Sequence, residues 1–485
     1  RIECSRRGWF LEARLRRTDV LVLGAGPTGL GAAWQLHADG GADWLLVEAA
    51  PGPGGAAASV TDPAGFTWDL GGHVIHSHFP LFDDVIARVV DDWSFPRRSG
   101  WVSAADPRAW GGGDGWVPTP LQRHIGLLPP PLRDRVVAEL ADRAVPGDAA
   151  DGKGPVQIGE SLEEFFVAAF GRSLTATFFR PFNTWGHPPA ELGHAWTSLR
   201  SGSTAPNVPE VDLSLTRPHT PDDTSTFPFP TYGSGAVWSG VARALPADRQ
   251  VYGDAAAALD SRERVVTLRD GHRIGYELLV SSIPLPTLLA LCSETPRPAV
   301  DATRLRHSGT HAVGLGFLGQ PPPRLRDVSY VYVPDADVPV HRATVLSHYS
   351  PAMAGPGRWS LLFEAGCSPR LPVSSADALS SAIEQARRWD AEAAPVSVWQ
   401  RFLPYGYPVP TLDRDRVLNR VQRWLESVGI LSRGRFGGWR YESCNQDYAF
   451  MQGVEAVGAV LRGTPERVYW PGRQPAIAGP ARACA

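Results

Sequence analysis

The spacing of apolar residues predicts that the chain opens with a strand, a helix and a second strand. Residues 20–23 and 44–47 are continuous apolar runs, and residues 29–37 between them have helical spacing. Short apolar runs on both sides of a helical stretch are typical of parallel strands that are buried on both faces. We therefore expect a β–α–β unit in this part of the chain.

The apolar pattern changes twice farther along. Between about residues 93 and 221, helical spacing occurs in short stretches separated by loops rich in proline and glycine, at 132–143, 161–170 and 174–179. Strand-like runs then flank Asp270-Gly271, a dipeptide typical of hairpins, and recur after residue 311. The expected strands are residues 264–268, 274–279, 312–317, 330–333, 343–346 and 359–363. A helical run at 448–461 follows them.

Three glycines connect the first strand to the first helix in the pattern Gly24-x-Gly26-x-x-Gly29. The first allows a tight turn, the second lets the backbone approach a pyrophosphate, and the third lets the helix pack against the strand. Glu48 ends the second strand, where a carboxylate can accept hydrogen bonds from ribose hydroxyls. In this setting the motif predicts a Rossmann-like dinucleotide site.

Two more glycine pairs favour FAD over NAD as the dinucleotide. Gly54-Gly55 follows Glu48 closely, and Gly71-Gly72 comes later. A flavin cofactor is long and lies against several backbone segments, each of which must approach it closely, whereas an NAD site does not need the extra glycines. The acidic Glu48 also disfavours the 2′-phosphate of NADP. We therefore expect an FAD site.

Glycine-rich segments near both ends of the chain indicate one FAD-binding domain interrupted by two insertions. The predicted fold is α/β, with a discontinuous Rossmann-like FAD-binding domain, a helical insertion and an antiparallel-sheet substrate domain. We assign the FAD-binding domain to residues 18–96, 222–310 and 412–485, the helical insertion to 97–221 and the sheet domain to 311–411. Residues 1–17 are rich in arginine, lack the apolar core of a signal peptide and are expected to be a flexible extension.

Composition argues against several classes of protein. With 47 Lys and Arg against 50 Asp and Glu, the formal net charge is −3, and no basic tract indicates nucleic-acid binding. No apolar run reaches the ~18 residues needed to span a bilayer. The five cysteines are scattered without metal-ligand spacing, which favours a reducing cytoplasm. His73, His76 and His78 lie close together, but no spaced carboxylate or cysteine completes a metal site with them.

Residues 432–447 concentrate arginine, glycine and aromatic residues just before the last helical run. Glycines let the backbone come close to a ligand, and arginines bind anions. Asn445 or Asp447 is expected to cap the helix and leave its positive N-terminal end facing a ligand. The segment therefore predicts the place where cofactor and substrate meet.

Several longer motifs resemble UDP-galactopyranose mutases of the eukaryotic type, within the superfamily of FAD-dependent amine oxidases and protoporphyrinogen oxidases. They follow the family's order from about residue 18 to 473, and the matching segments are 22–31, 69–78, 180–183, 341–344, 347–351, 405–411 and 432–456. The first segment is shared with many flavoenzymes, whereas the later ones are far more specific.

The resemblance implies an isomerase that interconverts the pyranose and furanose rings of UDP-galactose, or of a related nucleotide sugar, with no net redox change. In that family, N5 of reduced FAD attacks the anomeric carbon while the nucleoside diphosphate leaves. The resemblance also suggests NAD(P)H as the external donor that reduces the flavin. It implies a nucleotide-sugar partner and leaves the oligomeric state open.

The resemblance assigns roles to individual residues, with two arginines at the diphosphate and a histidine on a loop that shifts when the flavin is reduced. The expected catalytic residues are Arg200, Arg342, His73 and Arg435. The expected substrate contacts are Arg98, Gln122, Phe178, Asn183, Trp185, Tyr332, Tyr349, Tyr407, Tyr441 and Asn445, of which Gln122 and Phe178 would meet the base. The expected cofactor contacts are Gly24, Gly26, Gly29, Glu48, Gly54, Gly55, Gly71, Gly72, Asn445 and Gln446.

The sequence leaves the substrate and two other functions open. Thr119 stands where the family usually has a tyrosine near the uracil, so a dTDP-sugar or a hexose other than galactose is an alternative. An FAD-dependent amine oxidase or desaturase-like enzyme would share the first motif, but its site would be poor in arginine, unlike one with Arg200 and Arg342. A silent protein that binds FAD and a sugar nucleotide is disfavoured because Arg342 and Tyr349 are both present.

Overall fold

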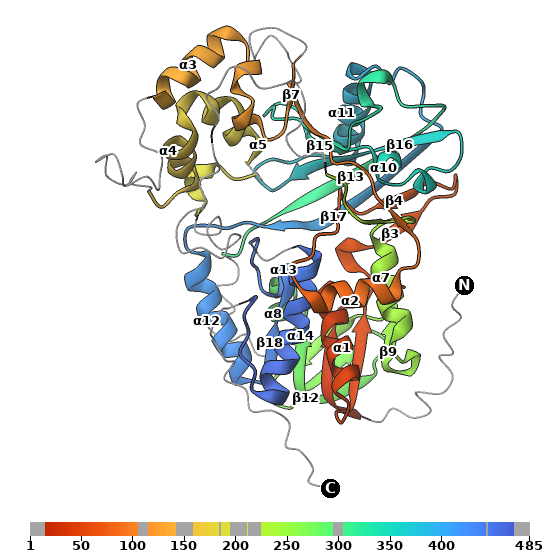
Figure 1. Cartoon of the computed structure of the whole chain (residues 1–485). Helices are drawn as coiled ribbons and strands as arrows, with labels where there is room; N and C mark the ends of the chain where they lie inside the picture. Colours follow the sequence, from red (N-terminus) through yellow and green to blue (C-terminus); the bar gives the residue numbers. More distant parts are fainter. Residues whose placement is uncertain are drawn as a thin grey trace.

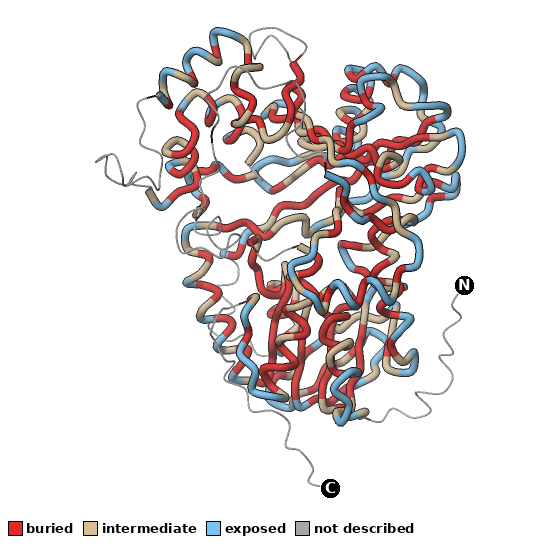
Figure 2. The backbone as a smooth tube through the Cα atoms, in the orientation of Figure 1, coloured by how far each residue is buried: buried red, intermediate tan, exposed pale blue. Residues whose placement is uncertain are grey.

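The computed structural model describes residues 15–104, 115–141, 159–183, 186–194, 211, 225–293, 304–442 and 445–469. It has an α/β layer built on one sheet, a second sheet packed beyond it, and a helical part beside the second sheet (Figure 1). Buried residues concentrate along the strands of both sheets (Figure 2). Within the described part of the chain, no helix is both long and apolar enough to cross a membrane.

The first sheet contains the predicted β–α–β unit and has the strand order β10-β11-β12-β1-β2-β9, with β18 paired to β12. β1 pairs in parallel with β2 and β12, and β12 pairs in parallel with β18. The hairpin predicted at Asp270-Gly271 is confirmed as β11 and β12, which pair antiparallel. The strands are β1 Arg16–Leu23, β2 Trp44–Glu48, β9 Gln250–Tyr252, β10 Ala256–Asp260, β11 Val265–Leu268, β12 Arg273–Ser281 and β18 Ile430–Ser432.

Helices cover both faces of this sheet because successive residues of β1 point to opposite sides. Val20 and Val22 face a core formed with α1, α2, α7 and α14, whereas Leu21 and Leu23 face a core formed with α8 and α12. The helices are α1 Pro27–Asp39, α2 Pro80–Val89, α7 Gly235–Ala244, α8 Leu285–Leu291, α12 Arg414–Ser427, α13 Gly434–Gly437 and α14 Gln446–Arg462.

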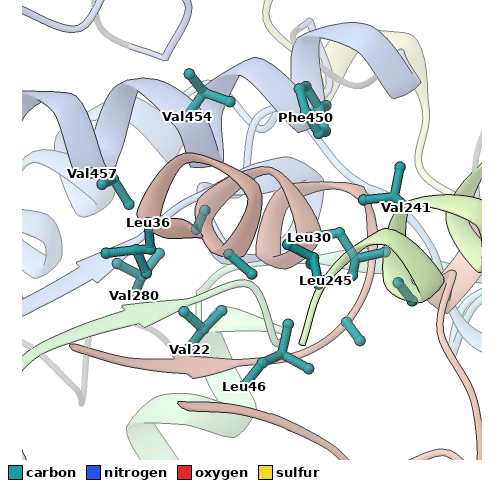
Figure 3. Packing of buried hydrophobic residues seen from close by; sticks show 14 of the residues in the cluster. Val22, Leu30, Leu36, Leu46, Val241, Leu245, Val280, Phe450, Val454 and Val457 are labelled. Atoms are coloured by element: carbon teal, nitrogen blue, oxygen red, sulfur yellow. The ribbon is translucent and has the colours of Figure 1, made fainter. Parts of the chain in front are cut away.

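Two glycines allow α1 and α14 to pack with their backbones in contact. A Cβ atom added to Gly31 would lie 2.1 Å from the carbonyl oxygen of Phe450, and one added to Gly453 would lie 1.9 Å from that of Thr28. In Figure 3, α1 lies between α14 and the strands. Its Leu30 belongs to the buried core that these elements share. The last helix is thereby fixed against the first helix of the chain.

The second sheet has the strand order β17-β13-β16-β15-β14-β6-β7 and is antiparallel except for the β14–β6 pair. Its strands are β6 Gly100–Ser103, β7 Trp116–Pro118, β13 His307–Leu318, β14 Tyr330–Tyr332, β15 Val340–Thr344, β16 Arg358–Cys367 and β17 Ser397–Pro408. Helices α10 Leu346–Tyr349 and α11 Ser375–Arg388 pack on it. Short pairs are formed by β3 Ser59–Thr61 with β4 Thr67–Asp69 and by β5 Trp93–Ser94 with β8 Phe229–Pro230.

The helical part has its own aromatic core, in which Phe179 stacks on Phe166 and Phe170, while Phe165 meets Phe166 at a tilt and Phe170 edge-on. It consists of α3 Pro130–Ala141, α4 Leu162–Leu174, the π-helix η6 Thr175–Phe179 and α5 Arg180–Phe182. Of the proposed helical range 97–221, β6 and β7 belong to the second sheet.

Several element boundaries differ from the sequence expectations for local reasons. The first helix starts at Pro27, before the predicted Gly29, because proline suits the first turn. The strand expected at 343–346 ends at Thr344, and α10 begins at Leu346. β17 was not predicted because many of its residues are exposed and its apolar pattern is weak. β1 begins at Arg16, inside the proposed extension.

The glycine contact between α1 and α14 predicts a position-specific effect on stability. Gly453→Ala should lower the free energy of unfolding by ~1–3 kcal/mol or more, because its methyl group would meet backbone that cannot move aside. Gly458→Ala is a matched control in the same helix: its methyl group would meet only the end of the flexible Arg462 side chain, and alanine favours the helix by ~1 kcal/mol. Urea unfolding measures the free energy of unfolding of both variants. Equal changes in the two variants would contradict the prediction.

Candidate functional site

Two adjoining cavities lie between the sheets. The first, of about 720 Å³, is at the carboxyl ends of β1, β2 and β12. The second, of about 700 Å³, is walled by β14, β15 and β16, the loop before α2 and the segment before α14. Among the described residues, His73, Arg435 and Gln446 line both cavities. A ligand in the first cavity can therefore reach the second at these residues.

Gly24, Gly26 and Gly55 lie on the floor of the first cavity. Gly24 has a φ of 95°, and a Cβ atom on Gly29 would lie 1.8 Å from the Gly24 carbonyl oxygen. Gly26 opens to the cavity, where an added Cβ would meet nothing closer than 4.0 Å. Gly54 and Gly55 also have positive φ values, of 111° and 53°. The backbone can therefore lie directly against a ligand, next to the N-terminus of α1.

Glu48 is held in place at the end of β2 by backbone amides. Its carboxylate accepts hydrogen bonds from the amides of Ala25, at 2.6 Å, and Ala50, at 2.7 Å. It also lines the first cavity, where a ribose of the dinucleotide is expected.

The far wall of the first cavity contains a polar group with an unused donor. Gln446 accepts a hydrogen bond from Trp238 through Oε1, at 2.7 Å, while its buried Nε2 has no partner among the described residues. A long cofactor with a polar ring edge therefore fits between the glycine floor and Gln446. Sequence reasoning missed other wall residues, including Ala255 and Ser282, although loops after parallel strands are where such contacts occur.

The second cavity contains a cation that is largely buried, since the side chain of Arg342 is 20% exposed. Arg342 in β15 lies opposite Tyr332 in β14 and Glu364 in β16. Its Nε is 3.5 Å from Glu364 Oε2, and its guanidinium carbon lies 5.6 Å and 6.0 Å from the ring centres of Tyr330 and Tyr332. Burial works against the charge, but Glu364 and the nearby tyrosines outweigh it and hold the pKa of Arg342 above its ordinary value. The guanidinium therefore stays charged.

Four predicted tyrosines, Tyr332, Tyr349, Tyr407 and Tyr441, come together on the wall of this cavity. Burial raises the pKa of Tyr332 to about 12 and raises those of Tyr349 and Tyr407 as well. Their hydroxyls therefore keep their protons and can donate hydrogen bonds to an anion. The guanidinium of Arg435 lies 5.5 Å from the ring centre of Tyr407, which adds a second cation to the same wall.

His73 stands at the boundary between the cavities as a neutral ring. Burial, then the positive charges of Arg435 and Arg342, lower its pKa to about 4, although Glu364 opposes the shift. The preceding residue packs closely, because a Cβ on Gly72 would lie 2.4 Å from Thr344 Oγ1 and 2.8 Å from Arg342 Nη2. The loop that carries His73 is thus pressed against Arg342.

The arginines of the segment 432–447 divide into two groups. Arg433 is buried and bonded to Glu466 at 2.6 Å and 2.8 Å, and Arg440 lies 3.2 Å from Glu442 in another buried ion pair. Arg435 lines both cavities. Composition alone could not separate the arginines that hold the segment from the one that lines the cavities.

The expected helix cap at the start of α14 is wrong. Asn445 occupies the N-cap position, but its side chain makes no capping hydrogen bond within the described residues and lines the second cavity. Asp447 lies in the first turn and binds His78. The start of the helix thus leaves polar side chains free to face other partners.

The remaining predicted residues lie in several places. Gly72, Arg98 and Asn183 line the second cavity, whereas Gly29, Gly54 and Gly71 line neither cavity. Gln122 and Phe178 are buried, 8% and 7% exposed, and Phe178 packs in the core of the helical part. Arg200 and Trp185 lie outside the described residues. Glu364, Tyr330 and His341 line the second cavity and were missed.

Thr119 has an aromatic neighbour. Its Oγ1 lies 3.4 Å from the hydroxyl of Tyr330, which lines the second cavity. Gly100 makes room for that ring, since a Cβ there would lie 2.3 Å from it.

Comparisons with known proteins agree with this geometry. The family model of the NAD(P)-binding Rossmann-like domain matches residues 22–92. A crystal structure of reduced UDP-galactopyranose mutase superposes with a TM-score of 0.83 and 34% identity, covering 95% of this chain and 98% of that one.

More distant structures share the fold alone. A putative protoporphyrinogen oxidase from Exiguobacterium sp. 255-15 has a TM-score of 0.66 at 16% identity, covering 92% of this chain and 98% of that one. Cyclohexylamine oxidase from Brevibacterium oxydans IH-35A has a TM-score of 0.63 at 16% identity, covering 91% and 98% of the two chains. Given its identity with the mutase over nearly the whole length of both chains, the protein belongs to the UDP-galactopyranose mutase family.

Proposed function

We propose that this protein is a flavin-dependent mutase that interconverts the pyranose and furanose rings of a nucleotide-linked hexose, with UDP-galactose as the first candidate. The observation that carries the proposal is the largely buried, charged Arg342 in a tyrosine-lined cavity that adjoins the first cavity. Breaking a glycosidic bond to a diphosphate builds negative charge on the leaving oxygens. A fixed cation and hydroxyl donors in a site with little water stabilise that charge.

Reduced FAD in the first cavity would supply the nucleophile, its N5 atom, for the anomeric carbon of the sugar. Gly26, Glu48, Gly55 and Gln446 are placed to hold the cofactor. Because the proposed reaction needs the flavin reduced and has no net redox change, an external donor must reduce it, and we propose NAD(P)H.

The protein's own part in the reaction is electrostatic and positional. Arg342 and the hydroxyls of Tyr332, Tyr349 and Tyr407 would bind the diphosphate before and after the bond breaks. Glu364 keeps the guanidinium charged when no phosphate is present. Arg200, the second arginine proposed to bind the diphosphate, would add its positive charge to that of Arg342.

His73 would act at the point where sugar and flavin meet. A neutral imidazole can donate or accept a hydrogen bond there without adding a third positive charge to those of Arg342 and Arg435. Asn445 and Tyr441, on the same wall, would contact the sugar or the phosphates.

The base of the nucleotide would lie toward Thr119. We propose that Tyr330 provides the aromatic surface that a threonine lacks, because its ring lines the cavity beside Thr119. An aromatic ring stacks on any base, so this arrangement supports either a uridine or a thymidine nucleotide.

An assay on a panel of nucleotide sugars tests the proposal. The protein loaded with FAD and chemically reduced should convert UDP-galactopyranose, or another UDP- or dTDP-hexose, to its ring isomer, whereas the oxidised protein should not. Chromatography of the sugar nucleotides measures the conversion. If no sugar of the panel is isomerised and the protein forms peroxide from an amine, an amine oxidase-like enzyme is favoured instead.

Replacing Arg342 separates substrate chemistry from cofactor binding. Arg342→Ala should lower turnover by ~10²–10³, because one preorganised donor to the developing charge is lost, yet leave the protein yellow with FAD. Arg401→Ala, on the exposed part of β17, is the control and should match the wild type. Loss of FAD from Arg342→Ala would show that this residue serves the cofactor.

The lowered pKa of His73 predicts a dependence of stability on pH. Its pKa is about 4 in the folded protein and ~6.5 in an unfolded chain, so the unfolded state binds the proton more readily. The stability linked to neutral His73 is therefore lost as the pH falls from ~6.5 to 4, by about 3 kcal/mol. In the cofactor-free protein, His73→Gln should reduce the loss of unfolding free energy between pH 7 and pH 4. Exposed His37→Gln should show the wild-type loss, and identical profiles for all three proteins would refute the prediction.

A further inference from the structure

The loop that carries His73 connects β4 to α2 without regular secondary structure. Its first half is shaped by a hydrogen bond from the amide of His73 to the carbonyl of Gly71, at 2.8 Å. The buried Nδ1 of its imidazole has no hydrogen-bond partner among the described residues. The way in which the two ends of the loop are fixed therefore contributes to the position of His73.

The second end of the loop is fixed by one carboxylate oxygen. Oδ2 of Asp447 accepts the backbone amide of His78 at 3.1 Å and lies 2.7 Å from Nδ1 of the same residue. Asp447 is fully buried, while the side chain of His78 is 52% exposed. The His78 ring also packs against Tyr448, with the ring centres 5.1 Å apart. Residues far apart in the chain are thus joined by two hydrogen bonds and a ring contact.

The carboxylate belongs to the same helical turn that borders the cofactor cavity. Asp447 follows Gln446, which lines both cavities, and lies in the first turn of α14, where the helix favours a negative charge. Gly31 and Gly453 in turn fix α14 against α1. Gln446 and the carboxylate that holds the end of the loop therefore lie in the same helical turn.

We propose that His78 and Asp447 form a clasp that positions His73 at the boundary between the cavities. Both are positioning residues that act through His73, and His78 also lines the second cavity. The effect of the clasp on turnover rests on the proposed mutase function, whereas its effect on the loop does not. Displacing a reacting partner by about 1 Å can cost ~10²-fold in rate, so a contact distant from the chemistry can control it.

The competing explanation is that the pair only strengthens the packing of α2 against α14. Variants of His78 distinguish the two, because its exposed side chain tolerates replacement without opening the core. His78→Leu removes the side-chain donor. His78→Asn keeps a donor at the same number of bonds from Cα, since Nδ2 of asparagine occupies the place of Nδ1. His37→Leu, on the exposed side of α1, is the control.

The first measurement is hydrogen exchange of the loop amides in the cofactor-free protein, and the second is kcat and KM for the reduced, FAD-loaded enzyme. In His78→Leu, exchange at residues 72–78 should rise at least ~10-fold, and kcat per bound FAD should fall ~10²-fold with little change in KM or thermal midpoint. His78→Asn should restore most of the loop protection and most of the kcat per bound FAD. His37→Leu should match the wild type in both measurements.

Three results would overturn the clasp: unchanged loop exchange in His78→Leu, a lowered thermal midpoint with unchanged kcat per bound FAD, or a His78→Asn variant as impaired as His78→Leu. A wild-type enzyme without mutase activity would instead refute the proposed function. In that case the hydrogen exchange of His78→Leu and His78→Asn still decides whether the clasp holds the loop.

Discussion

The backbone contact between α1 and α14 is the constraint on which the site depends. Because Gly31 and Gly453 lack side chains, the last long helix lies against the first one, and its N-terminus reaches the carboxyl ends of the parallel strands. This places Gln446 opposite the glycine loop and Asp447 within reach of the loop before α2. The boundary between the two cavities is built from segments near both ends of the chain, and this single packing contact brings them together.

The second constraint is the positive charge of arginines that are removed from water. Arg433 and Arg342 differ in how closely carboxylates pair with them. In the segment before α14, Arg433 is matched by buried carboxylates and serves the fold, since a buried cation that loses its partner is costly. Arg342 has a more distant ionic partner: Glu364 Oε2 lies 3.5 Å from its Nε, and the ring centres of Tyr330 and Tyr332 lie 5.6 Å and 6.0 Å from its guanidinium carbon. A cation that is stabilised but not saturated by its partners can still bind a diphosphate.

The first cavity could be predicted from the sequence because its features are local. The turn at Gly24, the close packing at Gly29 and the carboxylate of Glu48 all follow from residue type and spacing along one β–α–β unit. The second cavity could not be derived in this way, because Arg342 and Glu364 become neighbours only through strand register. A family resemblance located Arg342 but not Glu364. Nor could any local pattern reveal that His78 contacts Asp447.

The division into two cavities also bears on how one fold can serve different reactions. The distant oxidases share the overall fold with this chain, so the fold by itself does not specify the chemistry. Here the residues proposed to bind the diphosphate lie on adjacent strands β14, β15 and β16, with side chains that meet across the register. Substitutions on this sheet can change the second cavity while the glycine floor of the first stays intact. Under the proposed function, specificity for a charged leaving group belongs to Arg342 and its neighbours, and the first cavity can remain common to enzymes that need no such group.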